Sequence, residues 1–170
     1  MPSGRTSQTP AEYPYLEMPA KSASALLTPS VNEEIDRRLA RAGQRWTKGR
    51  RAVVDAMTGV SAPLSVPELQ DKVGPQVPLS SLYRIIADLL NAKVLLKLEF
   101  AEGFARFELY EGLLDHHHHL VCMECGSVAD LKLPDLEEVL EGSARPIKRR
   151  TGFKISNHRL DFFGVCHKCA

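Results

Sequence analysis

The segment PLSSLYRIIADLLNAKVLLKLEFAEGFARFELY, residues 78–110, decides the fold of the first half of the chain. Its first part repeats apolar residues at offsets of three and four, which predicts an amphipathic helix. The stripe expected to face a core comprises Leu79, Leu82, Ile85, Ile86, Leu89 and Leu90. Two strand-like runs follow at 94–100 and 104–110, and the turn between them contains Gly103, which predicts a hairpin.

Three shorter helices are expected before this segment. Residues 31–42 have a charged helical pattern, and Thr47 can cap a second helix that runs to about Met57. Ser65, with Glu68 three residues later, has the spacing of a capping box for the third. Together with the longer helix and the hairpin, these helices predict a winged helix-turn-helix domain.

The remaining segments divide around that domain, which we expect at residues 31–110 with its wing tip at 101–104. Residues 1–30 are rich in Pro, Ser, Thr and Ala and lack an apolar period, which predicts a disordered arm. Residues 111–115 are the expected hinge, and residues 116–170 the expected second domain. The predicted fold class is α+β, with a small α+β module after the winged helix.

The second domain is expected to contain three strands, at 118–122, 127–133 and 158–165. A helix is expected to start at Pro134 and to end before Pro146. A module of about 55 residues rarely buries enough apolar surface to be stable alone, so we expect a cross-link within it.

Charge is distributed unevenly along the 170 residues, although the net charge is only +1. Residues 37–51 contain seven basic side chains and no acidic one, whereas residues 111–141 are mainly acidic. This asymmetry indicates a basic front half that can contact DNA phosphates and an acidic back half. The sequence has neither an apolar run long enough for a membrane span nor a signal-peptide stretch, so we expect a cytoplasmic protein.

All four cysteines lie in two Cys-x-x-Cys pairs, Cys122 with Cys125 and Cys166 with Cys169. Two such pairs can supply the four thiolates that structural zinc prefers, which would cross-link the second domain. Two disulfides or a thioredoxin-like redox motif are the alternatives. The first is disfavoured in a cytoplasmic chain, and the second lacks its βαβ context.

Four consecutive histidines, 116 to 119, immediately precede the first cysteine pair. Successive side chains of a strand point to opposite faces, so His117 and His119 share one face and His116 and His118 the other. One run can therefore serve two metal sites. Spacing alone does not select the remaining ligands, for which Glu108, Asp130, Glu137 and His158 are available. The alternative is four solvated histidines on an edge strand.

Four motifs in order resemble the ferric uptake regulator family of bacterial metal-responsive repressors. They are PLSSLYRIIADLL, ARFELY, HHHHLVCMECGSVADL and GFKISNHRLDFFGVCHKC, and the similarity covers about residues 35–169. The resemblance implies a homodimer with an N-terminal winged-helix DNA-binding domain and a C-terminal dimerisation domain. It also implies that a bound metal holds the two domains in a DNA-binding arrangement.

The resemblance further implies functional residues, position by position. The structural zinc ligands are Cys122, Cys125, Cys166 and Cys169. The sensing-site ligands are Glu108, His117, His119 and Asp130, and the ligands of an additional site are His116, His118, Glu137 and His158. The DNA-binding residues are Arg45, Arg50, Ser80, Ser81, Tyr83 and Arg84.

Two features depart from the family pattern. Many iron and peroxide sensors have a histidine in the loop before the third helix, where this chain has Pro63, so Glu99 or Glu102 is the expected replacement. Zinc uptake regulators also often lack that histidine and have an unbroken histidine run, but they commonly place a cysteine between wing and run that this chain lacks.

The function expected from these features is a metal-dependent, sequence-specific DNA-binding transcriptional repressor that senses zinc and controls metal homeostasis, rather than an enzyme. The expected cofactors are structural Zn²⁺ and a second divalent ion, with Zn²⁺ favoured and Fe²⁺ or Mn²⁺ possible. The expected partners are a palindromic operator in double-stranded DNA and a second copy of the chain, without a membrane or a small-molecule substrate. An iron- or peroxide-sensing repressor is the alternative. A zinc hydrolase or deaminase is disfavoured because the sequence lacks His-x-Glu and four thiolates leave no position open for water.

Overall fold

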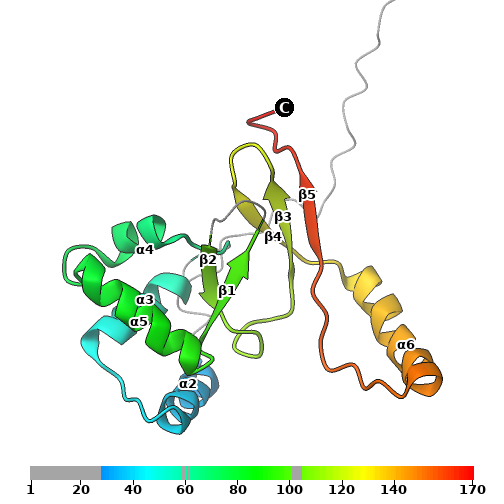
Figure 1. Cartoon of the computed structure of the whole chain (residues 1–170), viewed down its shortest axis with the longest axis horizontal. Coiled ribbons are helices and arrows are strands. Elements are labelled where there is room, and N and C mark those ends of the chain that lie inside the picture. The colour runs from blue at the N-terminus through cyan, green and yellow to red at the C-terminus, as the bar shows by residue number, and fades with distance from the viewer. Residues whose placement is uncertain (1–27, 59, 61, 101–104) are drawn as a thin grey trace, which may run out of the picture.

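Four helices and a hairpin make up the described part of the first half of the chain (Figure 1). The computed structural model describes residues 28–58, 60, 62–100 and 105–170. The helices are α2 (Pro29–Arg41), α3 (Lys48–Thr58), α4 (Val66–Val73) and α5 (Leu79–Asn91). β1 (Leu95–Glu99) pairs antiparallel with β2 (Ala105–Leu109).

The helix starts are set by side-chain caps. The hydroxyl of Thr47 accepts a hydrogen bond from the Arg50 N–H at 3.2 Å, as expected for the start of α3. The predicted capping box of α4 is confirmed, with the Ser65 N–H donating to the Glu68 carboxylate at 2.7 Å. α2 begins two residues earlier than predicted because Thr28 caps it, so the expected arm overlaps this helix. Residues 1–27 of that arm and the expected wing tip at 101–104 lie outside the described residues.

The main core lies between the four helices and one face of the hairpin. Its fully buried side chains include Ile35, Leu39, Val53, Val54, Leu69, Leu82, Leu89, Leu95 and Leu109. Each side chain of this size contributes about 1.5–3 kcal/mol when it is removed from water. Leu79 was expected in the core but is 51% exposed, because it is the first residue of α5 and lies beyond the surface that the other elements cover.

A three-stranded sheet forms the second half, in the order β4-β3-β5. β3 (His118–Cys122) pairs antiparallel with β4 (Val128–Leu131) and parallel with β5 (Asp161–Gly164). The three strand predictions are confirmed. The predicted end of the following helix is wrong, because α6 (Pro134–Thr151) continues through Pro146. The proline removes one hydrogen bond to the Gly142 carbonyl, and Gly142 is exposed so that water can replace it.

The two halves meet where the hairpin packs on the sheet. Leu98 and Phe100 form a small buried cluster with Val121 of β3. α6 stands apart from the rest of the chain in Figure 1, and none of its residues is buried. Val139 of α6 and Phe162 and Phe163 of β5 are large exposed apolar side chains. Within the described residues, helices that combine the length and apolarity needed to cross a bilayer are absent.

Candidate metal centres

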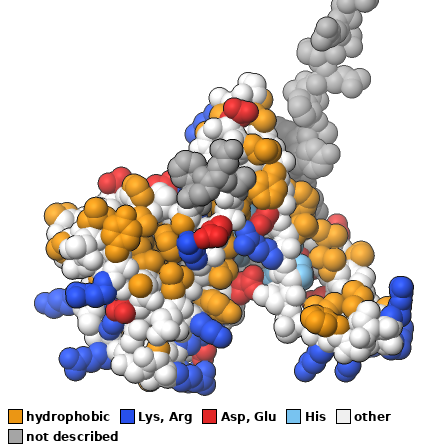
Figure 2. All heavy atoms as spheres, viewed as in Figure 1, with side chains coloured by type: hydrophobic (Ala, Val, Ile, Leu, Met, Phe, Trp, Pro, Cys, Tyr) orange, Lys and Arg blue, Asp and Glu red, His pale blue; other side chains and the backbone are white. Residues whose placement is uncertain are grey.

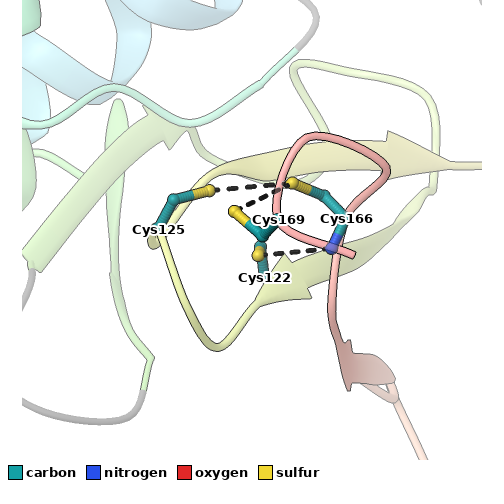
Figure 3. A group of neighbouring side chains, drawn as sticks. All are labelled: Cys122, Cys125, Cys166 and Cys169. Carbon is teal, nitrogen blue, oxygen red and sulfur yellow. Dashed lines mark hydrogen bonds between the residues drawn. The ribbon is translucent and has the colours of Figure 1, made fainter.

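The four cysteines lie together at the end of the three-stranded sheet (Figure 3). Cys122 ends β3, Cys125 follows in the turn to β4, and Cys166 and Cys169 lie in the turn after β5. The sulfur of Cys166 is 3.8 Å from that of Cys125 and 3.6 Å from that of Cys169, and all four cysteines are free thiols. Zinc–sulfur bonds of about 2.3 Å place tetrahedral sulfurs roughly 3.8 Å apart, so these spacings fit a zinc ion.

The thiol pKa values show why this cluster suits a cation. Backbone N–H groups of Cys125 and Cys166 lower the pKa of Cys122 to about 6. Interactions with the neighbouring thiols of Cys125 and Cys166 raise the pKa of Cys169 to about 12. Four sulfurs this close cannot all be anionic without a compensating positive charge. A divalent ion would supply that charge, which agrees with the thiolate set that zinc prefers.

A second group, which we call the junction site, consists of Glu108, His117, His119 and Asp130. Its ligand atoms all lie within 4.8 Å of one another. Glu108 comes from β2, the two histidines from β3 and the residues just before it, and Asp130 from β4, so the group joins the hairpin to the sheet. The Nε2 atoms of His117 and His119 each lie 3.2 Å from the same Glu108 oxygen. Bonds of about 2.0 Å to a tetrahedral ion separate such atoms by roughly 3.3 Å, so the donor set fits a divalent ion.

The junction site is buried, and its charges depend on one another. Glu108, His117 and His119 are exposed by only 7%, 8% and 4%. Burial raises the pKa of Glu108, but hydrogen bonds from the two imidazoles outweigh it and lower the pKa to about 2. Burial lowers the pKa of both imidazoles, but the Glu108 carboxylate together with Asp115 and Asp130 at His117, and with Asp161 at His119, more than offsets this, so both pKa values are raised. Two carboxylates and two imidazoles at this depth offer four donors that could hold a divalent cation.

The side of the junction site that faces the helices is apolar. Met57, Val60, Ala62 and Leu114 line a small cavity beside Glu108 and His117. Pro63 is buried, and its carbonyl accepts a hydrogen bond from Arg106. Glu99, one expected replacement for the missing loop histidine, is exposed and paired with Lys97. The expectation for Glu99 is therefore wrong, and Glu102 lies outside the described residues.

A third group, which we call the α6 site, consists of His116, His118, Glu137 and His158. Its ligand atoms also lie within 4.8 Å of one another. The Nε2 atoms of His116 and His158 are 3.1 Å apart, and His158 Nε2 is 3.3 Å from a Glu137 oxygen. Burial lowers the pKa of His116, which favours the neutral imidazole that metals bind. Glu137 lies in the first turn of α6, so the group connects this helix to β3.

The structure thus sorts the histidine run by parity, as strand geometry predicts. His117 and His119 face the hairpin, whereas His116 and His118 face α6. Asp161 was not identified from the sequence as a residue near the junction site. Its carboxylate lies 3.1 Å from Nδ1 of His119, because β5 pairs in parallel with β3. No signal in the sequence indicates this contact, because the register between β3 and β5 cannot be read from a sequence in which β4 and α6 separate the two strands.

Most of the expected DNA-binding residues have exposed side chains, whereas one of them makes hydrogen bonds within the fold. Ser80, Tyr83 and Arg84 are exposed near the start of α5, and Arg45 is exposed in the loop before α3. Ser81 is half-buried. Arg50 is engaged within the fold, where its guanidinium donates to the Asp88 carboxylate at 2.7 Å and to the Arg45 carbonyl at 2.6 Å. The structure therefore does not place Arg50 with the exposed set.

Basic side chains lie along the outer edge of the helices in Figure 2 and again at the far end of α6. Some basic side chains of the stretch 37–51 make contacts within the fold. Arg38 pairs with Glu34, and Arg51 stacks on the Trp46 ring with its guanidinium carbon 3.6 Å from the ring centre. Arg41, Arg45 and Lys48 remain exposed.

Comparisons with known proteins agree on one family. The model of the ferric uptake regulator family matches residues 41–163. The ferric uptake regulation protein of Bacillus subtilis is 43% identical over 96 residues, which are 56% of this chain and 62% of that protein. The peroxide operon regulator of the same organism is 26% identical over 131 residues, 75% of this chain and 86% of that protein. The crystal structure of the Vibrio cholerae ferric uptake regulator superposes with a TM-score of 0.61 at 26% identity, covering 77% of this chain and 98% of that one.

Proposed function

The chain belongs to the ferric uptake regulator family, whose members are transcriptional regulators and not enzymes, and on that basis we propose that it is a metal-dependent repressor. It binds a palindromic operator in double-stranded DNA as a homodimer, in the cytoplasm. The first half acts as a winged-helix domain that presents α5 to the major groove. The exposed apolar side chains of α6 and β5 are the surface that a second copy covers.

One observation carries this proposal, namely the convergence of Glu108 with His117 and His119. Glu108 lies on the hairpin that follows α5, and the two histidines belong to the three-stranded sheet. The carboxylate is therefore one link between the half that carries α5 and the half that carries the dimer surface. Binding of a metal by Glu108 would therefore alter how the two halves are positioned relative to one another.

The residues of the junction site explain how metal binding could switch DNA binding on. When bound, a divalent ion supplies positive charge that offsets the carboxylates of Glu108 and Asp130. Glu108 then holds the hairpin on the sheet, and α5, which leads directly into the hairpin, is held with it. Two α5 helices in a dimer must lie about 34 Å apart to enter successive major grooves. A looser Glu108 leaves this spacing undefined, which lowers the population that fits the operator.

Zinc is the first candidate for the junction site. Its four donors match the number that tetrahedral zinc takes, and the cavity beside Glu108 is lined mainly by apolar residues that offer no fifth ligand within the described residues. Iron is the second candidate, favoured by the 43% identity to a ferric uptake regulation protein, and the mixed imidazole and carboxylate donors also suit Fe²⁺ and Mn²⁺. A peroxide-sensing role is the corresponding alternative, given the match to a peroxide operon regulator.

The other two clusters have separate roles in this proposal. The cysteine cluster holds a structural zinc ion that stabilises the end of the sheet, because its four sulfurs leave no open position. The α6 site binds an additional divalent ion more weakly, since His116 is exposed and His158 and Glu137 are only partly buried. Tyr83 and Arg84 contact bases or backbone, with Ser80 and Ser81 beside them, and Arg45 contacts phosphate. Arg50 supports these residues through Asp88 of α5.

The proposal is tested by titrating the zinc-containing dimer anaerobically with Zn(II), Fe(II) or Mn(II) while measuring anisotropy of a labelled palindromic duplex. The parent protein should bind DNA only when one of these ions is added. His117→Ala and Glu108→Ala should abolish the response, whereas His116→Ala, which alters the α6 site, should retain it. DNA binding that is independent of metal in the parent protein, or unchanged in His117→Ala, would show that the junction site is not the sensor.

A further inference from the structure

His119 lies at the centre of a row of three ionisable side chains across the sheet. In the register of the strands, it is opposite Asp130 of β4 on one side and opposite Asp161 of β5 on the other. Residues directly opposite one another in neighbouring strands project from the same face. The two carboxylates therefore flank one imidazole, and only Asp130 belongs to the junction site.

The two ring nitrogens of His119 have different partners. Nε2 faces the Glu108 oxygen at 3.2 Å, whereas Nδ1 faces the Asp161 oxygen Oδ1 at 3.1 Å. His119 is 4% exposed, and the Asp161 side chain is 14% exposed, so water competes little for this contact. A neutral imidazole has one N–H donor and one acceptor nitrogen, and its partners decide which nitrogen carries the proton.

We propose that Asp161 is a positioning residue of the junction site. It accepts the Nδ1–H hydrogen bond of His119 and thereby directs the Nε2 lone pair toward Glu108 and the other ligands. This role rests on the proposed function, because it matters only if the junction site binds metal. Carboxylates that hold the second nitrogen of a metal-binding histidine orient the ring and increase its basicity.

The surroundings of Asp161 hold its carboxylate in place. Its second oxygen, Oδ2, forms an ion pair with the guanidinium of Arg159 at 2.6 Å. Arg159 in turn lies over the Phe100 ring, and the rings of Phe100 and His119 pack edge-to-face with their centres 5.7 Å apart. Each oxygen of Asp161 thus has its own partner, so rotation of the carboxylate would break one of the two interactions.

His117 and His118 differ from His119 in the partner of their Nδ1 atom. Nδ1 of His117 is paired with the backbone carbonyl of Asp115 at 2.9 Å, so both junction-site imidazoles present Nε2 to Glu108. His118 of the α6 site is 1% exposed, yet its Nδ1 has no hydrogen-bond partner among the described residues. The junction site is therefore oriented on both of its histidines, and only His119 depends on a side chain for this.

The test follows the histidine ring nitrogens by ¹⁵N NMR while the full-length dimer is titrated with chelator-buffered Zn(II). The His119 signals report this site alone, which separates it from the other two. Asp161→Ala should weaken Zn(II) binding at His119 by roughly 10–100-fold and remove the fixed Nδ1–H tautomer. Asp161→Asn retains an acceptor oxygen, so it should keep the tautomer with a smaller loss of affinity. Glu99→Ala removes an exposed carboxylate elsewhere on the hairpin and should match the parent protein.

The outcomes distinguish this inference from the proposed function. If Asp161→Ala keeps the parent affinity and the parent tautomer while Glu108→Ala loses binding, Asp161 has no positioning role and the metal site stands. If Glu108→Ala also binds Zn(II) like the parent, the proposed function itself fails. Should Asp161→Ala unfold, Asp161→Asn decides through its Zn(II) affinity at His119, because a merely structural role would leave that affinity at the parent value whereas the positioning role lowers it.

Discussion

The guanidinium of Arg106 donates a hydrogen bond to the backbone carbonyl of Gly126 at 2.9 Å. Arg106 lies on β2, and Gly126 lies in the turn that follows Cys125, so the contact joins the hairpin to the cysteine cluster. The same guanidinium donates to the Glu68 carboxylate at 2.9 Å and to the Pro63 carbonyl at 3.1 Å. One side chain therefore connects the start of α4 to the expected zinc-binding turn.

Replacing Arg106 should weaken both halves of the protein. Arg106→Met keeps much of the aliphatic stem but removes three hydrogen bonds to the loop, the capping carboxylate and the turn. The free energy of unfolding should fall by about 1.5–3 kcal/mol, the range for hydrogen bonds to charged groups. Urea denaturation measures this, and Arg41→Met on the exposed side of α2 is the control. Equal stability of the two variants would show that the Arg106 contacts contribute nothing.

Glu68 should give part of the stability a defined dependence on pH. Burial raises the pKa of Glu68, but hydrogen bonds from Ser65 and the charge of Arg106 outweigh it, so the pKa lies below the usual value of 4.5. A carboxyl whose pKa is depressed on folding stabilises the protein above pH 4.5, and this contribution is lost as the pH falls through the depressed value. Glu68→Gln should therefore lose stability relative to the parent at pH 6 and converge with it in acid. Parallel curves for the two proteins from pH 6 to pH 3 would contradict this.

Removing the ion expected in the cysteine cluster should unfold the second half first. A chelator that strips zinc, or Cys122→Ser, removes the cross-link between the turns after β3 and β5. Binding and folding free energies are coupled in such sites, so hydrogen exchange should accelerate in β3, β4 and β5 before it does in α5. Met123→Ala, at an exposed position of the same turn, should behave like the parent. Retention of exchange protection in the metal-free sheet would exclude a structural role for zinc.

Tyr83 and Arg50 should affect DNA binding in different ways. Tyr83 is 57% exposed on α5, so Tyr83→Ala should lower operator affinity by about 1–3 kcal/mol and leave the free energy of unfolding unchanged. Arg50→Ala breaks the ion pair with Asp88 between α3 and α5, and should lower stability as well as affinity. Anisotropy and urea denaturation of both variants separate these effects. A loss of stability in Tyr83→Ala would indicate that this tyrosine supports the fold.

Local patterns predicted most helices and strands and the sorting of the histidines between two sites, although they misplaced the end of α6 and the start of α2. The Ser65 and Glu68 spacing predicted a helix start because a capping box involves only neighbouring residues. The alternation of a strand separated His117 and His119 from His116 and His118 for the same reason. The pairing of each face with Glu108 and Asp130, or with Glu137 and His158, came from a family resemblance, and the structure brings the same residues together.

What the sequence determined by itself is therefore the period of each element, its caps, and the ligand types that the cysteines and histidines offer. What only the tertiary structure decided is which distant groups meet. Asp161 reaches His119 through the register of two parallel strands, and Arg106 reaches Gly126 through packing of the hairpin on the sheet. Leu79 has the periodicity of a core residue but extends past the surface that would bury it. Periodicity depends on backbone geometry within a few residues, whereas register and burial depend on the relative placement of whole elements, which no local pattern encodes.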